Sequence, residues 1–358
     1  MRRHTGMRRV TAWVLVLISA FSFVSCAKAD MGIAEIVLSL AGDCTLAADE
    51  PLHGSPDSFV GVMNAQGNDY RYPLALAQNL FAQDDFTLVN LECVLTDRWE
   101  LRNTSLYLNF RGPADYVKIL TKGSVEGVSM SNNHALDYGI DGLRDCQRVL
   151  DQAGVKWAYN QDYFTFERKG VKFAVFSFRR YYMEAYYTWL EEAIARVKKD
   201  EGVQFVIVCL HHGEEYEEKH NDHDQTRFAH HAIDYGADLV VGTHPHVLQG
   251  VEVYKDRLIL YSLGNFSFGG NNRPFASSIP TAVMQVKLTF DGNYLFSSQL
   301  TVWPYHATGT APYSNYQPTP VTGADAQEVM DILQRDTPFP LNPFIEGEGA
   351  VQDIIYVK

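Results

Sequence analysis

The stretch LVVGTHPHV at residues 239–247 decides the fold, because an unbroken aliphatic run stops abruptly at two histidines. Such runs without polar alternation are typical of strands that are buried on both faces of a sheet. In open α/β sheets, ligands gather where the carboxyl ends of these strands emerge into loops. His244 and His246 lie two residues apart, so an extended segment would place both rings on one side.

Four other apolar runs also end in side chains that commonly bind metals. They are IVLSLAGD with Asp43, FTLVNLE with Glu92, GVSMSNNHALDYG with Asn133 and His134, and FVIVCLHHG with His211. Because ligands gather at the carboxyl ends of such strands, we expect these side chains to converge. Carboxylates, an amide and imidazoles together favour Mn, Fe or Zn over Mg or Ca, which prefer oxygen alone. The sequence therefore predicts one or two divalent metal ions at this sheet edge.

The rest of the chain alternates between strand and helix patterns, which indicates an α/β fold. Residues 139–154, GIDGLRDCQRVLDQAG, predict an amphipathic helix that ends at Gly154. Residues 257–266, RLILYSLGNF, predict a strand, and residues 111–113 predict a turn. Near the C-terminus, Asp291 and Gly292 join two alternating runs, a pattern that predicts a β-hairpin.

Length and charge limit the classes of function. The chain has 358 residues and 46% hydrophobic content, which is enough for a substantial core. A formal charge of -13 and a pI near 5.3 argue against a nucleic-acid binder, which needs a basic face. An anionic polymer would need a local cationic site on this chain, and a bound metal would supply one.

The N-terminal residues predict export. Arginines precede an apolar stretch at residues 10–24, which is too short to favour a membrane-spanning helix. The segment Phe23-Val24-Ser25-Cys26 then resembles a bacterial lipobox, with Phe23 where Leu is usual, so Cys26 is the expected lipidation site. An ordinary cleaved signal or an uncleaved anchor is the alternative. All three readings place the folded part outside the cytoplasmic membrane, and we expect a lipoprotein anchored in the cell envelope.

Four cysteines follow the predicted signal region: Cys44, Cys93, Cys146 and Cys209. An exported chain can pair such residues, and four cysteines allow three connectivities. Cys44 and Cys93 each directly follow a candidate ligand carboxylate. We interpret them as small buried residues at strand ends, with ligation by a thiolate or a mutual disulfide as alternatives.

Short motifs occur in a fixed order between residues 36 and 268. They are GD at 42–43, NLE at 90–92, FRGP at 110–113, NNHxxDxG at 132–139, HHGEEY at 211–216, GTHPHVLQG at 242–250 and SLGNFSF at 262–268. The set resembles the CapA group of poly-γ-glutamate capsule biosynthesis proteins, which are similar to calcineurin-like metallophosphatases. The combination is highly specific and covers most of the chain beyond the signal region.

The resemblance implies a four-layer α/β/β/α sandwich with two mixed sheets, of the calcineurin-like metallophosphoesterase type. This domain would span residues 27–310, between a signal peptide at 1–26 and a C-terminal extension at 311–358 packed on the domain. The implied metal ligands are Asp43, Glu92, Asn133, His211, His244 and His246. Asn133 and His134 are the implied catalytic residues, with His134 protonating the leaving group.

The chain departs from the phosphatase pattern at three places. Asp43 is followed by Cys44 and Thr45, whereas the phosphatases usually carry Asp-x-His and so gain a nitrogen ligand. Glu92 replaces the usual Asp of the second motif, and His212 stands where the family commonly has Trp. The number of metals and the phosphate-ester nature of the substrate are therefore left open.

The expected function is that of an exported metal-dependent hydrolase, similar to phosphoesterases, in the biosynthesis of poly-γ-glutamate or another cell-surface polymer. The alternative is a non-catalytic binding component of a polymer synthesis and export complex. The expected partners are an anionic cell-surface polymer or its precursor, proteins of a capsule synthesis complex, and the membrane through the lipid anchor. Nucleic acid is not expected as a partner.

Several polar residues allow two interpretations. Arg111 either binds a substrate anion or pairs with an acidic neighbour, and Asn265 either bonds within the site or forms a turn. Glu214 either contacts substrate or is a solvated loop charge. Asp137 either supports His134 or caps the helix after it. A histidine-rich region is expected to lie on the surface rather than to form a second metal site: His220, His223, His230 and His231.

Overall fold

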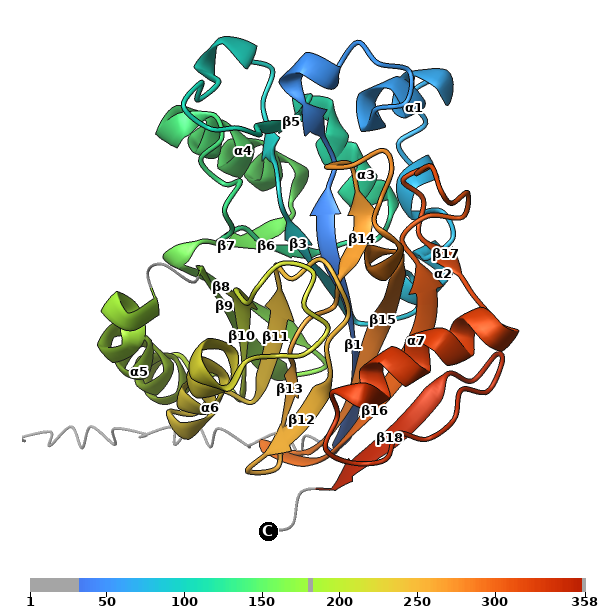
Figure 1. Cartoon of the computed structure of the whole chain (residues 1–358). Coiled ribbons are helices and arrows are strands. Elements are labelled where there is room, and N and C mark those ends of the chain that lie inside the picture. Colours follow the sequence, from blue (N-terminus) through green and yellow to red (C-terminus); the bar gives the residue numbers. More distant parts are fainter. Residues whose placement is uncertain (1–31, 180–182, 356–358) are drawn as a thin grey trace, which may run out of the picture. The chain divides into compact units, whose positions relative to one another are not determined.

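Two mixed β-sheets form the centre of the fold (Figure 1). A computed structural model describes residues 32–179 and 183–355, so the predicted signal region and Cys26 lie outside the described residues. The larger sheet has nine strands in the order β17-β16-β15-β1-β3-β6-β7, with β14 paired to β1 and β18 to β16. Their bounds are β1 Ile33–Thr45, β3 Phe86–Leu91, β6 Gly127–Ser129, β7 Lys156–Ala158, β14 Asn265–Phe268, β15 Pro280–Asp291, β16 Tyr294–His306, β17 Thr319–Pro320 and β18 Ala350–Ile355.

The second sheet has six strands in the order β12-β13-β11-β10-β9-β8. Their bounds are β8 Asn160–Arg168, β9 Val171–Arg179, β10 Phe205–His211, β11 Leu239–Thr243, β12 Val251–Tyr254 and β13 Arg257–Leu260. A third, three-stranded sheet joins β2 (Ala48–Asp49), β5 (Phe110–Gly112) and β4 (Val94–Leu95). The turn predicted at residues 111–113 is therefore wrong, because Arg111 and Gly112 pair with β2 and β4 as part of a strand.

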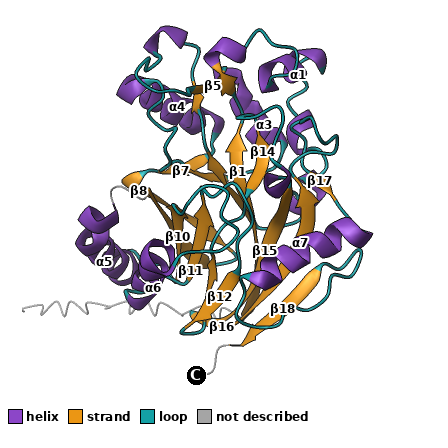
Figure 2. Cartoon of the chain, in the orientation of Figure 1, coloured by secondary structure: helices purple, strands orange, loops and turns teal. Residues whose placement is uncertain are grey.

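Helices lie outside the strand-rich centre (Figure 2). The α-helices are α1 Phe59–Ala65, α2 Gln78–Phe81, α3 Val117–Lys122, α4 Gly139–Ala153, α5 Met183–Asp200, α6 Arg227–Asp234 and α7 Gly323–Arg335. Single turns of 3-10 helix are η1 Glu50–Leu52, η2 Tyr72–Leu74, η3 Trp99–Leu101, η4 Ala114–Tyr116 and η7 Ala276–Ser278, and η6 (Asp222–Thr226) is a π-helical turn. Among the described residues, no helix is both long and apolar enough to span a membrane.

Three apolar clusters show that the two main sheets pack face to face between helices. In β10, Phe205, Ile207 and Cys209 join the cluster shared with the larger sheet. The intervening Val206, Val208 and Leu210 face α5 and α6 in a second cluster. A third cluster joins the outer face of the larger sheet to α1, α2, α3 and α4. This period of two along a doubly buried strand produces the predicted four-layer α/β/β/α sandwich, which is confirmed.

The sequence patterns outside the centre also agree with the structure in most places. Helix α4 ends at Gly154, which adopts a left-handed conformation with φ 75°, as expected for a glycine that closes a helix. The predicted hairpin is formed by β15 and β16, with Asp291 paired to Tyr294. Beyond residue 310, β17 and β18 pair with β16, and α7 packs its apolar residues into the core between the sheets. The boundary at residue 310 stays a prediction.

The run RLILYSLGNF does not form one strand, because the chain crosses between the two sheets within it. Strand β13 pairs with β11 in the six-stranded sheet, whereas β14 pairs with β1 in the larger sheet. The crossing residues pass so close to β1 that a Cβ at Gly42 would collide with the carbonyl oxygen of Gly264. The Asp43 amide donates a hydrogen bond of 2.9 Å to that same carbonyl. Glycine at position 42 thus lets the two sheets meet at their carboxyl edge.

We predict that Gly42→Ala destabilises the fold by about 1–3 kcal/mol or more, because the added methyl group would push the crossing segment away from β1. Equilibrium urea unfolding measures this change. Gly54→Ala is the matched control, because an added Cβ there meets nothing within 4 Å, and its effect should stay within about 0.5 kcal/mol. Equal stability of the two variants would show that the close approach is not a constraint.

Candidate metal centre

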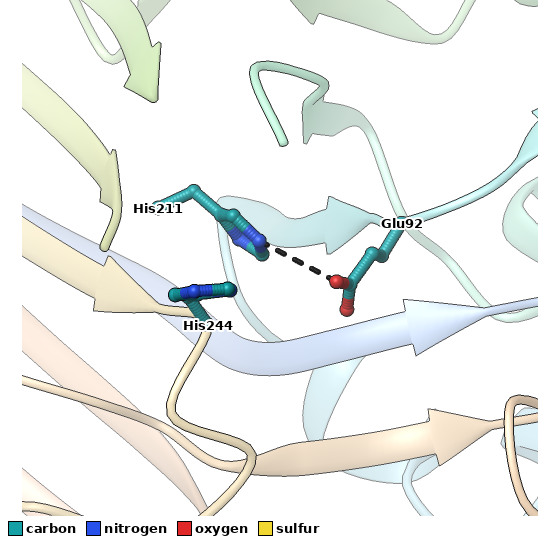
Figure 3. Close-up of side chains that lie close together, drawn as sticks. All are labelled: Glu92, His211 and His244. Atoms are coloured by element: carbon teal, nitrogen blue, oxygen red, sulfur yellow. Dashed lines mark ion pairs between the residues drawn. The ribbon is translucent and has the colours of Figure 1, made fainter. Parts of the chain in front are cut away.

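Glu92, His211 and His244 converge where strands of the two sheets end (Figure 3). Glu92 follows β3 in the larger sheet, and His211 and His244 stand at the ends of β10 and β11 in the smaller sheet. The Nε2 atom of His211 lies 3.4 Å from Oε1 of Glu92. The rings of His211 and His244 are 4.6 Å apart between centroids. The predicted convergence of ligands from separate strands is therefore present.

Asp43 and His246 complete the cluster. Nδ1 of His246 lies 3.2 Å from Oδ2 of Asp43 and 4.0 Å from Oε2 of Glu92. The side chains of Asp43 and Glu92 are both fully buried, at 0% exposure. Three sets of residues each bring one ligand atom per residue within 4.8 Å of one another: Glu92 with His211 and His244, Asp43 with Glu92 and His246, and Glu215 with His244 and His246. Glu92, His244 and His246 each belong to two of these sets, so the sets overlap in one cluster.

Unsatisfied polar atoms test whether a cation fits this cluster. Both carboxylate oxygens of Glu92 and Nδ1 of His244 are buried and have no hydrogen-bond partner among the described residues. Burying a carboxylate without such partners is costly unless a cation compensates its charge. The donor set of carboxylate oxygens and imidazole nitrogens also suits Mn, Fe or Zn. The residues present therefore fit one or two divalent ions.

Burial and mutual charge shift the pKa values of the acidic members. Burial would raise the pKa of Asp43, but hydrogen bonding and charge from His246, with further contributions from His211 and Asn90, hold it below its usual value. Burial and the charge of Asp43 raise the pKa of Glu92 to about 8. A carboxyl group with so high a pKa is held neutral at pH 7 when no cation is near.

Burial acts to lower the pKa of all three histidines, but nearby carboxylates reverse the outcome for His246. Burial lowers the pKa of His211 to about 3 and that of His244 to about 2, so both are neutral imidazoles, the form that binds metals. Burial alone would lower the pKa of His246 as well, but the charges of Glu92 and Asp43 outweigh it and raise it to about 9. A protonated His246 therefore acts as the internal counter-ion of Asp43, whose Oδ2 lies 3.2 Å from its Nδ1.

The loop that carries His244 and His246 is not extended as predicted. His244 has φ 103° and His246 has φ 59°, both in the left-handed region, which costs free energy for residues with a side chain. Their rings are inclined by 58° with centroids 6.1 Å apart, rather than side by side along a strand. Both rings still reach the cluster because the backbone turns at each histidine around Pro245.

Hydrogen bonds from neighbouring side chains orient the ligands. The amide of Asn90 donates to Oδ1 of Asp43 over 2.8 Å. Thr243 Oγ1 lies 3.0 Å from Nδ1 of His211, which leaves Nε2 directed at Glu92 and 2.8 Å from Oδ1 of Asn133. Asn265, delivered by the crossing segment, places its Oδ1 2.9 Å from Nδ1 of His246. Such partners fix the tautomer and direction of a histidine ligand.

His134 is held beside the cluster by Asp137. Its Nδ1 atom lies 2.7 Å from Oδ2 of Asp137, and its ring packs on Phe110 with centroids 4.3 Å apart. The same Asp137 oxygen accepts the Phe110 amide over 2.7 Å. Burial raises the pKa of Asp137 despite its bond to His134. Asp137 therefore supports His134, which is one of its two predicted roles. It does not cap the following helix, because α4 has no side-chain cap.

A polar cavity of about 520 Å³ opens beside the cluster. Its lining includes three predicted site residues, Asn133, His211 and His244. Residues 213–216, which include Glu214, and Arg179 at the end of β9 form other parts of the lining. A substrate in this cavity would therefore lie against the candidate ligands and would meet both acidic and basic side chains.

Arg111 lies away from this cavity in a structural ion pair. Its Nε donates to Oε2 of Glu50 over 2.7 Å, and the Arg111 side chain is only 11% exposed. A second bond from Nη1 reaches the carbonyl oxygen of Thr96. These bonds match the interpretation in which Arg111 pairs with an acidic neighbour. A contact between Arg111 and substrate stays a prediction.

Three histidines of the histidine-rich region lie beside acidic side chains. Only His223 is strongly exposed, and His220, His230 and His231 are partly buried beside Asp336, Glu252 and Glu191. None of these four histidines belongs to a candidate metal group among the described residues.

Four cysteines are free and buried, as expected of small core residues: Cys44, Cys93, Cys146 and Cys209. Burial raises the pKa of each thiol.

The structure adds residues that the sequence did not single out. Glu215 groups with His244 and His246. Arg179 and Tyr216 line the cavity, and Asn90 and Thr243 orient the ligands. Asn90 belongs to the NLE motif and Thr243 to the GTHPHVLQG motif, and this membership is the signal that the sequence offered for them.

The sequence model of a family described as "Bacterial capsule synthesis protein PGA_cap" matches residues 37–270, more than half of the 358 residues. "Capsule biosynthesis protein CapA" of Bacillus anthracis is 27% identical over 303 residues, covering 77% of this chain and 69% of that protein. "PGA biosynthesis protein CapA" of Bacillus subtilis is 27% identical over 254 residues, covering 65% of each chain. The chain thus matches about two thirds of these relatives' lengths.

Two solved structures illustrate the similarity in three dimensions. The calcineurin-like phosphoesterase YfkN from Bacillus subtilis aligns with 12% identity and a TM-score of 0.42, covering 85% of this chain and 97% of that one. A hypothetical protein from Thermus thermophilus aligns with 17% identity and a TM-score of 0.43, covering 75% of this chain and 99% of that one.

We predict that binding of Mn²⁺ to this cluster releases protons and tightens as the pH rises towards about 9. The reason is that Glu92, with a pKa of about 8, and His246, with a pKa of about 9, both hold protons at pH 7 before a cation displaces them. Titration calorimetry in buffers of different ionisation heat counts the released protons. Glu50→Gln, outside the cluster, should leave the proton count unchanged, and a pH-independent affinity would contradict the prediction.

Proposed function

The chain belongs to the bacterial capsule synthesis protein PGA_cap family, and from this premise we propose that it acts in cell-surface polymer synthesis as a metal-dependent hydrolase. The proposed substrate is poly-γ-glutamate, another anionic surface polymer, or a precursor of either. The bond cleaved would be a phosphoester or an amide. Because the matched relatives extend beyond the matched region, the activity, substrate and partners of this chain are all part of the proposal.

One observation carries the proposal. Glu92 is a fully buried carboxylate with no hydrogen-bond partner among the described residues, and three histidines and Asp43 surround it. A merely structural cluster would satisfy these atoms with hydrogen bonds, because unsatisfied buried groups destabilise a fold. The cluster also adjoins a polar cavity instead of being sealed in the core. This arrangement supports a site that holds a cation and admits a substrate.

The chain's own residues would orient and protonate the substrate. A bound divalent ion supplies Lewis-acid polarisation of the substrate oxygen and lowers the pKa of water. The residues that would hold it are Asp43, Glu92, Asn133, His211, His244 and His246, joined by Glu215. The 2.7 Å bond to Asp137 fixes the His134 tautomer with a hydrogen on Nδ1. Nε2 of protonated His134 is then the atom that donates to the leaving group.

The cell envelope is the proposed location of this activity. The basic and apolar N-terminal sequence and Cys26 support export and lipid anchoring at the membrane. Two or more acyl chains hold a protein stably on a bilayer, whereas one chain does so only marginally. The name "Probable polyglutamine synthesis accessory protein" of a Mycobacterium tuberculosis relative, 25% identical over 264 residues, supports proteins of a synthesis complex as partners.

We predict that the metal-loaded protein hydrolyses p-nitrophenyl phosphate and that His134→Ala lowers kcat by about 10²- to 10⁴-fold, because that substitution removes the proton donor. A chelator should abolish turnover, and Mn²⁺ should restore it. The measurement is release of p-nitrophenolate alongside elemental analysis of each variant.

His223→Ala is the matched control for this experiment, because the His223 side chain is 87% exposed and its turnover should be unchanged. His134→Ala must retain the metal content of the parent protein, since His134 is not among the proposed ligands. Protein that holds metal yet hydrolyses neither this ester nor a γ-glutamyl amide would favour the non-catalytic binding component instead.

We predict that Cys26→Ser abolishes fatty-acid labelling of the full chain in a bacterial host, because the thiol that carries the lipid is lost. Radiolabelled palmitate and the intact mass of the membrane-extracted protein measure the modification. Ser22→Ala, in the same segment, should keep the label. A cleaved chain that appears unlabelled in the soluble extracytoplasmic fraction would show an ordinary signal peptide.

A further inference from the structure

A row of rings leads outward from the candidate metal centre. The ring of Tyr216 lies 5.9 Å from the His246 ring, and the Phe275 ring lies 4.9 Å beyond it at an angle of 73°. Tyr216 lines the cavity, yet it is 41% exposed, and Phe275 is 56% exposed. Phe275 is not part of the cavity lining, but its contact with Tyr216 extends the accessible ring surface outward from the cavity. Accessible apolar surface of this kind marks sites that bind ligands or partners.

The backbone at Tyr216 is held in an unfavourable conformation. Tyr216 has φ 64°, in the left-handed region that residues with a side chain seldom adopt. Its amide donates to the carbonyl oxygen of Pro245 over 2.8 Å, which ties it to the loop between His244 and His246. Strain of this kind persists where the surrounding structure enforces it, and it is concentrated at functional sites. The position of the Tyr216 ring is thus coupled to the ligand loop.

Contacts with distant segments fasten residues 217–220, which continue the chain from Tyr216. Gln249 donates to the carbonyl oxygen of Glu217 over 2.8 Å, and Arg335 pairs with Glu218 at 2.6 Å. Asp336, just after α7, accepts bonds from both the amide and Nδ1 of His220 at 3.1 and 2.9 Å. A preformed surface binds a ligand without the cost of ordering a loop.

The polar lining near these rings indicates what kind of group they receive. Glu214 and Glu215 lie next to Tyr216 in the cavity wall, and both are exposed. The charge of Glu214, which is not among the proposed metal ligands, disfavours a carboxylate or a chain of phosphates beside Tyr216. A hydroxyl group, in contrast, can donate to a carboxylate and can accept from the side-chain amide of Asn133, which also lines the cavity. The C–H face of a sugar ring also suits the negative face of an aromatic ring.

We propose that Tyr216 and Phe275 form a subsite that binds a pyranose ring of the substrate, next to the candidate metal centre. The proposal rests on the proposed function in that the sugar is attached to the ester or amide that reaches the metal ligands. It narrows the substrate to a glycan or glycosylated precursor. A plain γ-glutamyl chain has no ring to stack on these side chains.

The test is ligand-observed NMR with the full chain in detergent, using saturation transfer to simple probes. The probes are the methyl glycosides of glucose, galactose and N-acetylglucosamine, with γ-glutamylglutamate and adenosine monophosphate as competitors. We expect at least one glycoside to receive saturation at its ring C–H protons. Tyr216→Ala and Phe275→Ala should each weaken its Kd by about five- to tenfold, the usual range for losing one ring contact.

Matched variants keep this test decisive. Tyr216→Phe should retain glycoside binding, because the ring face remains, and Tyr107→Ala removes a ring that is 94% exposed and absent from the cavity lining. All variants should unfold at the temperature of the parent protein. The proposal is overturned if no glycoside binds, if Tyr216→Ala leaves glycoside binding unchanged, or if a competitor alone binds in a Tyr216-dependent way.

Two readouts separate this subsite from the proposed hydrolysis. Glycoside binding is measured with and without chelator, whereas ester hydrolysis requires the loaded metal. Hydrolysis without glycoside binding would overturn the subsite alone. Glycoside binding that depends on Tyr216, in protein that hydrolyses nothing, would support the subsite and overturn the catalytic part of the proposed function.

Discussion

Two fully buried carboxylates, Asp43 and Glu92, set the central constraint on this structure. Charges removed from water destabilise a fold unless partners or a cation compensate them. Asp43 has such partners in Asn90 and His246, but Glu92 lacks hydrogen bonds among the described residues. The surrounding imidazoles, amides and glycines can be understood as the means by which the chain holds this acidic pair in one geometry. Asp43 and Glu92 therefore lower the stability of the fold wherever no partner or cation compensates their charge.

The geometry depends on bringing two sheet edges together. Glu92 and Asp43 come from the larger sheet, and His211 and His244 from the smaller one, so neither sheet alone makes the site. The segment between β13 and β14 passes from one sheet to the other at this edge and delivers Asn265 to His246. Gly42 and Gly242 permit the passage, because a Cβ at either would collide with a carbonyl oxygen of that segment. The site therefore needs both its polar side chains and glycines at the two positions where backbones pass closely.

Residues beyond the family match also shape the cavity. Asp336 and Arg335 lie outside residues 37–270, yet they fasten the loop that carries Glu214, Glu215 and Tyr216. Helix α7 packs into the core between the sheets, so this fastening is part of the main fold. The candidate ligands at the strand ends are thereby combined with a cavity wall that the C-terminal segment positions. Differences in substrate among relatives are expected to arise in such walls, because loops vary more than the strands that present the ligands.

The sequence alone determined most of the strands and the ligand types at their ends, since uninterrupted Val, Ile and Leu runs followed by Asp, Glu, Asn and His are local patterns. It also indicated the four layers through the resemblance of its motifs. Only the tertiary structure decided that His244 and His246 turn through left-handed conformations, that Arg111 pairs with Glu50, and that Glu215 joins the cluster. These outcomes depend on contacts between residues far apart in the chain. Local propensity contains no information about which distant partner a charged side chain meets.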